Sequence, residues 1–242
     1  MEEEEKARND EEYKAIQMAM KQNIPNNYEE DLVLGASQND THKVRNALKN
    51  GADINRYHDG ANAIGNAIIN NNANMVNFLL INGCNPNCPY FQDKFWFRRP
   101  IHLAICNNNI ELTQHLLEAG VKPNSRDFDQ RTCLFWAGVK DNVEIAELLL
   151  RKGASVNTSQ RDGLTAAHMA SYLGKMRICK WLLSHGADIN KQANDNWTPL
   201  HAAVINGNQE MVQLYLEHGA DPNLKTKDGE TALHMGASFI MG

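Results

Sequence analysis

The sequence lacks a long apolar run, a basic leader and a regular framework of cysteines. No stretch of the chain approaches the roughly 18 uncharged apolar residues of a membrane-spanning helix. It starts MEEEEK, the opposite of a secretory signal peptide, so we expect an intracellular protein that is cytoplasmic or also nuclear. The cysteines are odd in number and scattered, as is typical of reduced thiols. They are Cys84, Cys88, Cys106, Cys133 and Cys179.

The chain also lacks a basic surface. Residues 1–12 contain seven acidic and two basic side chains, a net charge of −5, which equals that of the whole chain. The rest is neutral and offers nothing to displace counterions from a phosphate backbone, so we expect no nucleic-acid partner. We interpret residues 1–27 as a solvated acidic tail. Its apolar stripe of Tyr13, Ile16 and Met20 predicts a short helix, either packed on the first repeat or free.

A repeat dominates the rest of the sequence. A glycine recurs in the phrase LLxxGAxxN or a variant of it, and the steps between successive glycines are 32, 37, 33, 33 and 33. These glycines are Gly51, Gly83, Gly120, Gly153, Gly186 and Gly219. A period of this length indicates stacked supersecondary units, none of which can bury an apolar core alone.

A second phrase lies between the glycines and is clearest at residues 197–203, WTPLHAA. Thr198 is a helix cap and Pro199 suits the first turn. The next helix is predicted from Gln209 to His218, ended by Gly219 in the left-handed conformation. Its expected inward residues are Met211, Val212, Leu214 and Leu216.

The two phrases in this order resemble the ankyrin repeat, whose pattern is D-G-x-T-P-L-H-x-A-A followed by L-L-x-x-G-A-x-x-N. The resemblance implies an all-α solenoid of stacked helix-turn-helix repeats with protruding finger loops over residues 28–242. The implied repeats are 28–58, 59–91, 96–128, 129–161, 162–194 and 195–227, with a partial seventh from Asp228. The first two repeats depart from the pattern. A capping role explains the departure of the first, because terminal repeats are atypical. The sequence ends inside a repeat, which leaves the natural C-terminus open.

Catalytic patterns are missing from the sequence. It contains no phosphate-binding glycine loop and no nucleophile elbow. Four histidines occupy the T-P-L-H position, where the family's imidazole bridges neighbouring backbones: His102, His168, His201 and His234. We therefore expect neither an enzyme nor a cofactor.

One group has the outline of a zinc site. Cys84 and Cys88 are four residues apart, as are His102 and Cys106, which makes two ligand pairs. Each of these residues also has an ordinary place in the repeat, and we interpret them as repeat residues without a metal.

The longest step, between Gly83 and Gly120, identifies the candidate binding site. Its extra length falls in the loop Asn87–Arg99, where aromatic and arginine side chains of the kind found in binding hot spots gather. They are Tyr90, Phe91, Phe95, Trp96, Phe97, Arg98 and Arg99. The alternative is that the rings fold back and fill an irregular repeat. The neighbouring fingers and inner helices add Tyr57, Phe128, Arg131, Trp136 and Tyr172 as partner-binding residues, although Trp136 equally suits the core.

These features predict a protein–protein interaction module or scaffold, monomeric on its own, that binds through its concave face and fingers. One alternative is a substrate-recognition subunit of a ubiquitin ligase, although the C-terminal box of that group is not visible. Another is a structural component of a cytoskeletal or ciliary assembly. The context of Asn190 also looks like that favoured by the asparaginyl hydroxylase of animal cells, the alternative being that Asn190 only caps its turn.

Overall fold

A computed structural model describes residues 27–89 and 99–241, with the side chains of 28–89 and 99–237. Contacts divide the chain into two compact units, Met1–Val121 and Lys122–Gly242. The regular secondary structure of the described residues is almost entirely helical, with one two-stranded hairpin. The all-α prediction is confirmed in both units.

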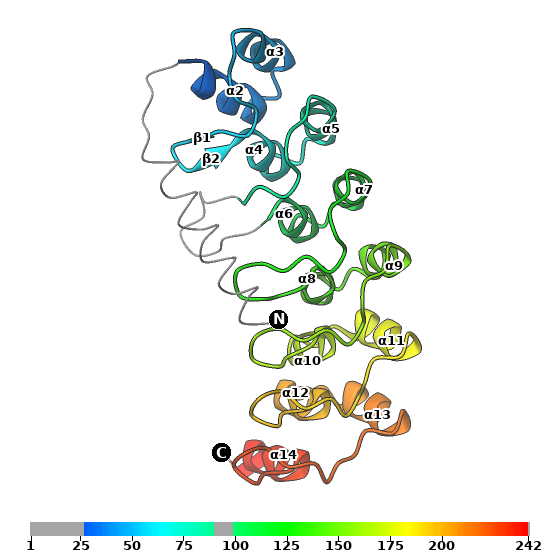
Figure 1. Cartoon of the computed structure of the whole chain (residues 1–242). Helices are drawn as coiled ribbons and strands as arrows, with labels where there is room; N and C mark the ends of the chain where they lie inside the picture. Colours follow the sequence, from blue (N-terminus) through cyan, green and yellow to red (C-terminus); the bar gives the residue numbers. More distant parts are fainter. Residues whose placement is uncertain (1–26, 90–98, 242) are drawn as a thin grey trace. The chain divides into compact units, whose positions relative to one another are not determined.

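The first unit pairs a row of inner helices with a row of outer helices (Figure 1). The inner row consists of α2 (Asn27–Ser37), α4 (Ala63–Ile69) and α6 (Pro100–Cys106). The outer row consists of α3 (Thr41–Lys49), α5 (Ala73–Ile81) and α7 (Ile110–Glu118). Strands β1 (Tyr57–His58) and β2 (Ala61–Asn62) pair antiparallel, with Tyr57 opposite Asn62, and form a finger.

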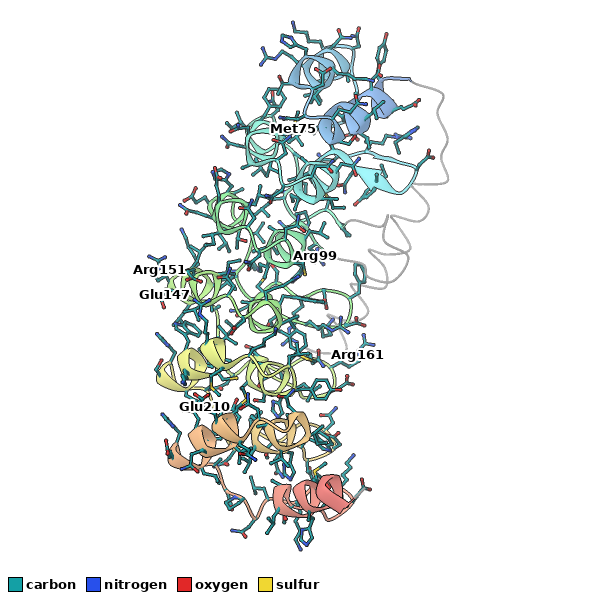
Figure 2. The ribbon with its side chains drawn as sticks, turned by 180° about the vertical axis from the view of Figure 1, so that it is seen from behind. Met75, Arg99, Glu147, Arg151, Arg161 and Glu210 are labelled. Carbon is teal, nitrogen blue, oxygen red and sulfur yellow. The ribbon has the colours of Figure 1, made fainter. Side chains whose placement is uncertain are left out.

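The second unit repeats the arrangement with greater regularity. Its inner row is α8 (Cys133–Lys140), α10 (Ala166–Tyr172), α12 (Pro199–Asn206) and α14 (Ala232–Met241). Its outer row is α9 (Val143–Arg151), α11 (Met176–Ser184) and α13 (Gln209–Glu217). Figure 2 shows Glu147 and Glu210 on the outer row and Arg161 on the opposite, finger side of the unit. Helix α14 is the single helix expected of the partial seventh repeat.

The predicted capping chemistry is present at the inner helices. Thr198 is the N-cap of α12 and its hydroxyl accepts a hydrogen bond from the His201 N–H, while Pro199 occupies the first turn. The same box starts α10, where the Thr165 N–H donates to His168 Nδ1. The other ring nitrogen of His168 then donates to the Trp197 carbonyl of the next repeat, at 3.1 Å. Burial lowers the pKa of His168, so the ring stays neutral in this bridge.

The inward face of α13 differs from the prediction in one position. Met211 is buried as expected, but Leu216 is 41% exposed and Tyr215 takes the buried place at 1%. Residues four apart share a helix face, so Met211 and Tyr215 point inward together, whereas Leu216 is one residue out of phase. The Tyr215 hydroxyl satisfies its burial with a short hydrogen bond to the Ser171 hydroxyl of α10.

In three successive repeats an asparagine joins one repeat to the next. The Asn157 side chain accepts from the Asp188 N–H at 2.8 Å and donates to the Gly186 carbonyl at 3.0 Å. Asn124 and Asn190 make the same pair of bonds one repeat before and one repeat after. These amides satisfy backbone groups that follow the left-handed glycine, where a helix end leaves donors and acceptors without partners.

Replacing Asn157 with alanine should lower the free energy of unfolding by about 1–2 kcal/mol, because two hydrogen bonds to backbone are lost. Urea unfolding followed by circular dichroism measures this change. Gln213→Ala is the matched control, since its amide only contacts Glu217 on the same exposed helix face. Equal midpoints for both variants would contradict the bridging role.

Candidate functional site: the finger side of the two units

In the first unit, the base of the finger is fixed by the carbonyl of Pro89. It accepts hydrogen bonds from the Tyr57 hydroxyl at 2.6 Å and from the Asn62 side chain at 2.9 Å. Asn62 is buried and also caps α4 by accepting from the Gly65 N–H. The hydroxyl of Tyr57 is therefore occupied within the chain.

Most of the aromatic loop lies outside the described residues, which include none of residues 90–98. The loop residues predicted to bind a partner there are Tyr90, Phe91, Phe95, Trp96, Phe97 and Arg98, and the prediction for them stays untested. Arg99 is described. It is the N-cap of α6 and its guanidinium donates to the Asn87 carbonyl at 3.1 Å. The two described ends of the loop are thus tied to each other.

The described structure includes the four residues of the zinc-like outline. Cys84 and Cys88 are buried, and the pKa of the Cys88 thiol is raised by its hydrogen bond with Cys84 and by burial. A raised pKa disfavours the thiolate that a metal requires. Within the described residues, no three histidine, cysteine or carboxylate side chains are arranged to hold a metal ion.

In the second unit, Trp136 belongs to a closed polar cluster in the fourth repeat. It is 8% exposed, and its indole N–H donates to the Asp127 carboxylate at 2.9 Å. The other oxygen of Asp127 accepts backbone N–H groups of Asp129 and Arg131. The Arg131 guanidinium lies 5.5 Å from the centre of the Trp136 ring and pairs with Asp129 at 3.0 Å. This burial favours the alternative that Trp136 belongs to the core.

Burial raises the pKa of Asp127, although its hydrogen bonds and the charge of Arg131 act in the opposite direction. The ionised carboxylate is therefore less stable in the folded chain than in water. The burial of this carboxylate therefore costs free energy where the finger packs against α8.

Successive fingers of the second unit are joined to one another. The Arg126 guanidinium donates to the Ser159 carbonyl at 2.9 Å, and the Arg161 guanidinium to the Phe128 carbonyl at 3.3 Å. Phe128 is half-buried within this ladder. Tyr172, another of the predicted binding aromatics of this unit, is 51% exposed.

A pocket of about 250 Å³ opens beside Tyr172, between α10 and α12. Its buried lining includes His168 and Ala202, and its exposed rim includes Tyr172 and Asp195. The full lining is Leu164, His168, Met169, Tyr172, Asp195, Trp197 and Ala202. It is mainly apolar, with a single carboxylate.

The first unit has its own pocket of about 440 Å³ between α2, α4 and the β1–β2 finger. Leu34 and Ile69 line it and are exposed. The pocket is more polar, with Glu30, Asp59 and two asparagines in its walls. Both units thus have a recess in the same structural place.

Comparison with known proteins agrees with this geometry. A family model described as ankyrin repeats (3 copies) matches residues 101–193 and 168–239, more than half of the chain. This chain belongs to the ankyrin-repeat family. Among solved structures, the ankyrin repeat domain of Bcl-3, described as a unique member of the IkappaB protein family, superposes with a TM-score of 0.74. That match has 22% identity and covers 88% of this chain and 98% of the other, which shows the fold.

A search of curated protein sequences gives no significant match. Ankyrin repeats are general protein–protein interaction modules and are typically not enzymes. None of the helices described in this ankyrin-repeat chain is both long and apolar enough to cross a membrane.

Asn190, the predicted hydroxylation site of this ankyrin chain, uses both ends of its amide. It donates to the Gly219 carbonyl at 3.1 Å and accepts from the Asp221 N–H at 2.8 Å. The turn-capping alternative is therefore present in the unmodified chain, and the hydroxylation prediction stays a prediction.

Sequence reasoning missed the pocket of the second unit, apart from Tyr172. A comparison between repeats could have found this pocket, because Ala202 stands two repeats after Trp136, at the equivalent place in the ankyrin repeat. A small residue there, next to the large ring of Trp197, leaves space that a tryptophan fills in the fourth repeat.

The stability of the chain should depend on pH through Asp127. Its folded-state pKa is raised above the ordinary 3.8, so its contribution is full below pH 3.8 and declines as pH rises through the folded value. Urea midpoints of the wild type and Asp127→Asn, measured from pH 4 to 8, should therefore diverge, the wild type losing stability relative to the variant. Parallel curves would show that Asp127 has no shifted titration.

Proposed function

We propose that the chain is a monomeric interaction module that binds a partner protein on the finger side, where inner helices and fingers meet. The observation that carries the proposal is the recess that each unit leaves open at this place. The recess of the second unit, at about 250 Å³, is smaller than the roughly 300–1,000 Å³ of typical small-molecule pockets, and it suits a side chain of another protein. We expect the partner to be neither nucleic acid nor membrane, because the formal charges of residues 13–242 sum to zero.

In the first unit, the chemistry of the recess favours apolar contacts. The amide of Asn66 donates to the Val33 carbonyl and that of Asn70 donates to the Ser37 carbonyl at 2.8 Å. These amides hold neighbouring helices together. Leu34 and Ile69 therefore offer the surface that gains most from being covered.

The outer row has a different character. Exposed ion pairs connect its helices in the second unit, Glu144 with Arg177 and Lys180 with Glu210. Such pairs contribute little energy and are typical of a solvated face. The outer row thus gives less reason than the finger side to expect a partner.

The aromatic loop is assigned to the same surface in the first unit. Its described ends are Pro89, which is held by the finger residues Tyr57 and Asn62, and Arg99, which is held by the Asn87 carbonyl. Both described ends of the loop are thus held by hydrogen bonds within the first unit. This supports Trp96 and Phe97 as anchors of the partner.

Partner capture tests the assignment. The full chain, tagged and used as bait, is compared with Trp96→Ala/Phe97→Ala, with Tyr172→Ala and with Leu34→Ser/Ile69→Ser, using quantitative mass spectrometry. For the identified partner, we expect at least one of these variants to weaken binding by more than about 2 kcal/mol, because aromatic and apolar anchors dominate interfaces.

Ile81→Ala is the matched control, since Ile81 is 76% exposed at the end of the outer helix α5. Circular dichroism must show unchanged helicity for every variant. A partner lost with Ile81→Ala but kept by all three finger-side variants would place binding on the outer row and overturn the proposal.

A further inference from the structure

The pocket of the second unit has one charged lining residue, Asp195. One of its oxygens accepts a long hydrogen bond of 3.3 Å from the Trp197 N–H. Among the described residues Asp195 has no ion-pair partner. The histidine of the pocket supplies no compensating cation, because His168 is neutral and both its ring nitrogens are engaged. The rim of the pocket is therefore negative.

The remaining walls suit an aliphatic stem and a flat cation. Leu164, Met169 and Ala202 are apolar, and the rings of Tyr172 and Trp197 border the same space. A guanidinium stacks on aromatic faces and donates two parallel hydrogen bonds to a carboxylate, while its three methylene groups pack on apolar surface. An acidic ligand would be repelled, and a purely apolar one would leave Asp195 unused.

The fourth repeat contains an internal precedent. There Arg131 pairs with Asp129 at 3.0 Å and lies over the Trp136 ring. Asp195 and Trp197 stand two repeats after Asp129 and Arg131, at the equivalent positions. The fourth repeat thus already holds a guanidinium against a finger carboxylate and an aromatic ring. The sixth repeat has Trp197 in place of that arginine.

We propose that the pocket lined by Tyr172, Asp195 and Trp197 receives an arginine side chain of the partner protein. The inference rests on the proposed function and specifies the chemistry that the partner must offer. The guanidinium takes the role that Arg131 has in the fourth repeat, between the Asp195 carboxylate and the aromatic rings.

Three capped pentapeptides test the proposal, Gly-Ser-X-Ser-Gly with X as arginine, citrulline or norleucine. Citrulline keeps the shape of arginine without its charge, and norleucine keeps only the apolar stem. The full chain is titrated with each peptide, and the Trp197 indole resonance is followed by NMR. The arginine peptide should bind about tenfold more tightly than either of the others, since charge-assisted hydrogen bonds and cation–π contacts are lost in them.

Asp195→Asn should lower the affinity for the arginine peptide by about fivefold or more and leave the affinity for the norleucine peptide unchanged. Asp228→Asn is the matched control, because Asp228 is the equivalent finger acid of the following repeat and does not line the pocket. It should bind like the wild type.

Equal binding of the norleucine and arginine peptides would overturn the inference and make the pocket an apolar anchor, with the proposed function intact. The inference is also wrong if no peptide shifts the Trp197 resonance, or if Asp195→Asn binds arginine as the wild type does. Failure of the proposed function is read separately, from partner capture by the three finger-side variants and Ile81→Ala.

Discussion

Stacking in this chain depends on hydrogen bonds between the asparagine amide of one repeat and the backbone of the next. A pair of helices of seven to nine residues cannot bury a core alone, so each repeat is stable only against its neighbours. The amides of Asn124, Asn157 and Asn190 set the register of that contact by bonding a carbonyl and an N–H two residues apart. The constant period of these repeats follows, because the same amide must reach the same backbone groups each time.

A fixed register brings equivalent positions into equivalent surroundings, so that differences between repeats carry the specificity. In the fourth repeat, the large Trp136 fills its place and Arg131 covers it. Two repeats later, Ala202 and Trp197 occupy the same two positions, and a pocket opens. The backbone is alike in both, and the change from closed to open requires only an exchange of side-chain volume. A repeat scaffold can thus acquire a binding site without altering its fold.

Local chemistry explains which features could be predicted from sequence. The caps at Thr198 and Pro199 and the end at Gly219 require only neighbouring residues, and the structure confirms them. The inward place of Tyr215 was missed because a run of apolar residues hides the helical phase, which its bond to Ser171 reveals. The bond between Trp136 and Asp127 depends on how the finger folds back on α8, and no local pattern encodes that. The binding role of Trp96 and Phe97 stays a prediction.

The finger that carries Asp195 is held in place before any ligand arrives. Its Asn194 N–H donates to the Asp162 carbonyl at 2.9 Å, and the Asp195 carbonyl accepts from the Lys227 N–H of the following finger at 2.9 Å. The approach is so close that a Cβ on Gly163 would lie 2.8 Å from the Asn194 nitrogen, and its φ of +79° also favours glycine. A carboxylate on a finger fixed from both sides loses little conformational entropy when it binds a cation. The glycine in the neighbouring finger therefore contributes to the pocket through the rigidity of its rim, although it touches no ligand.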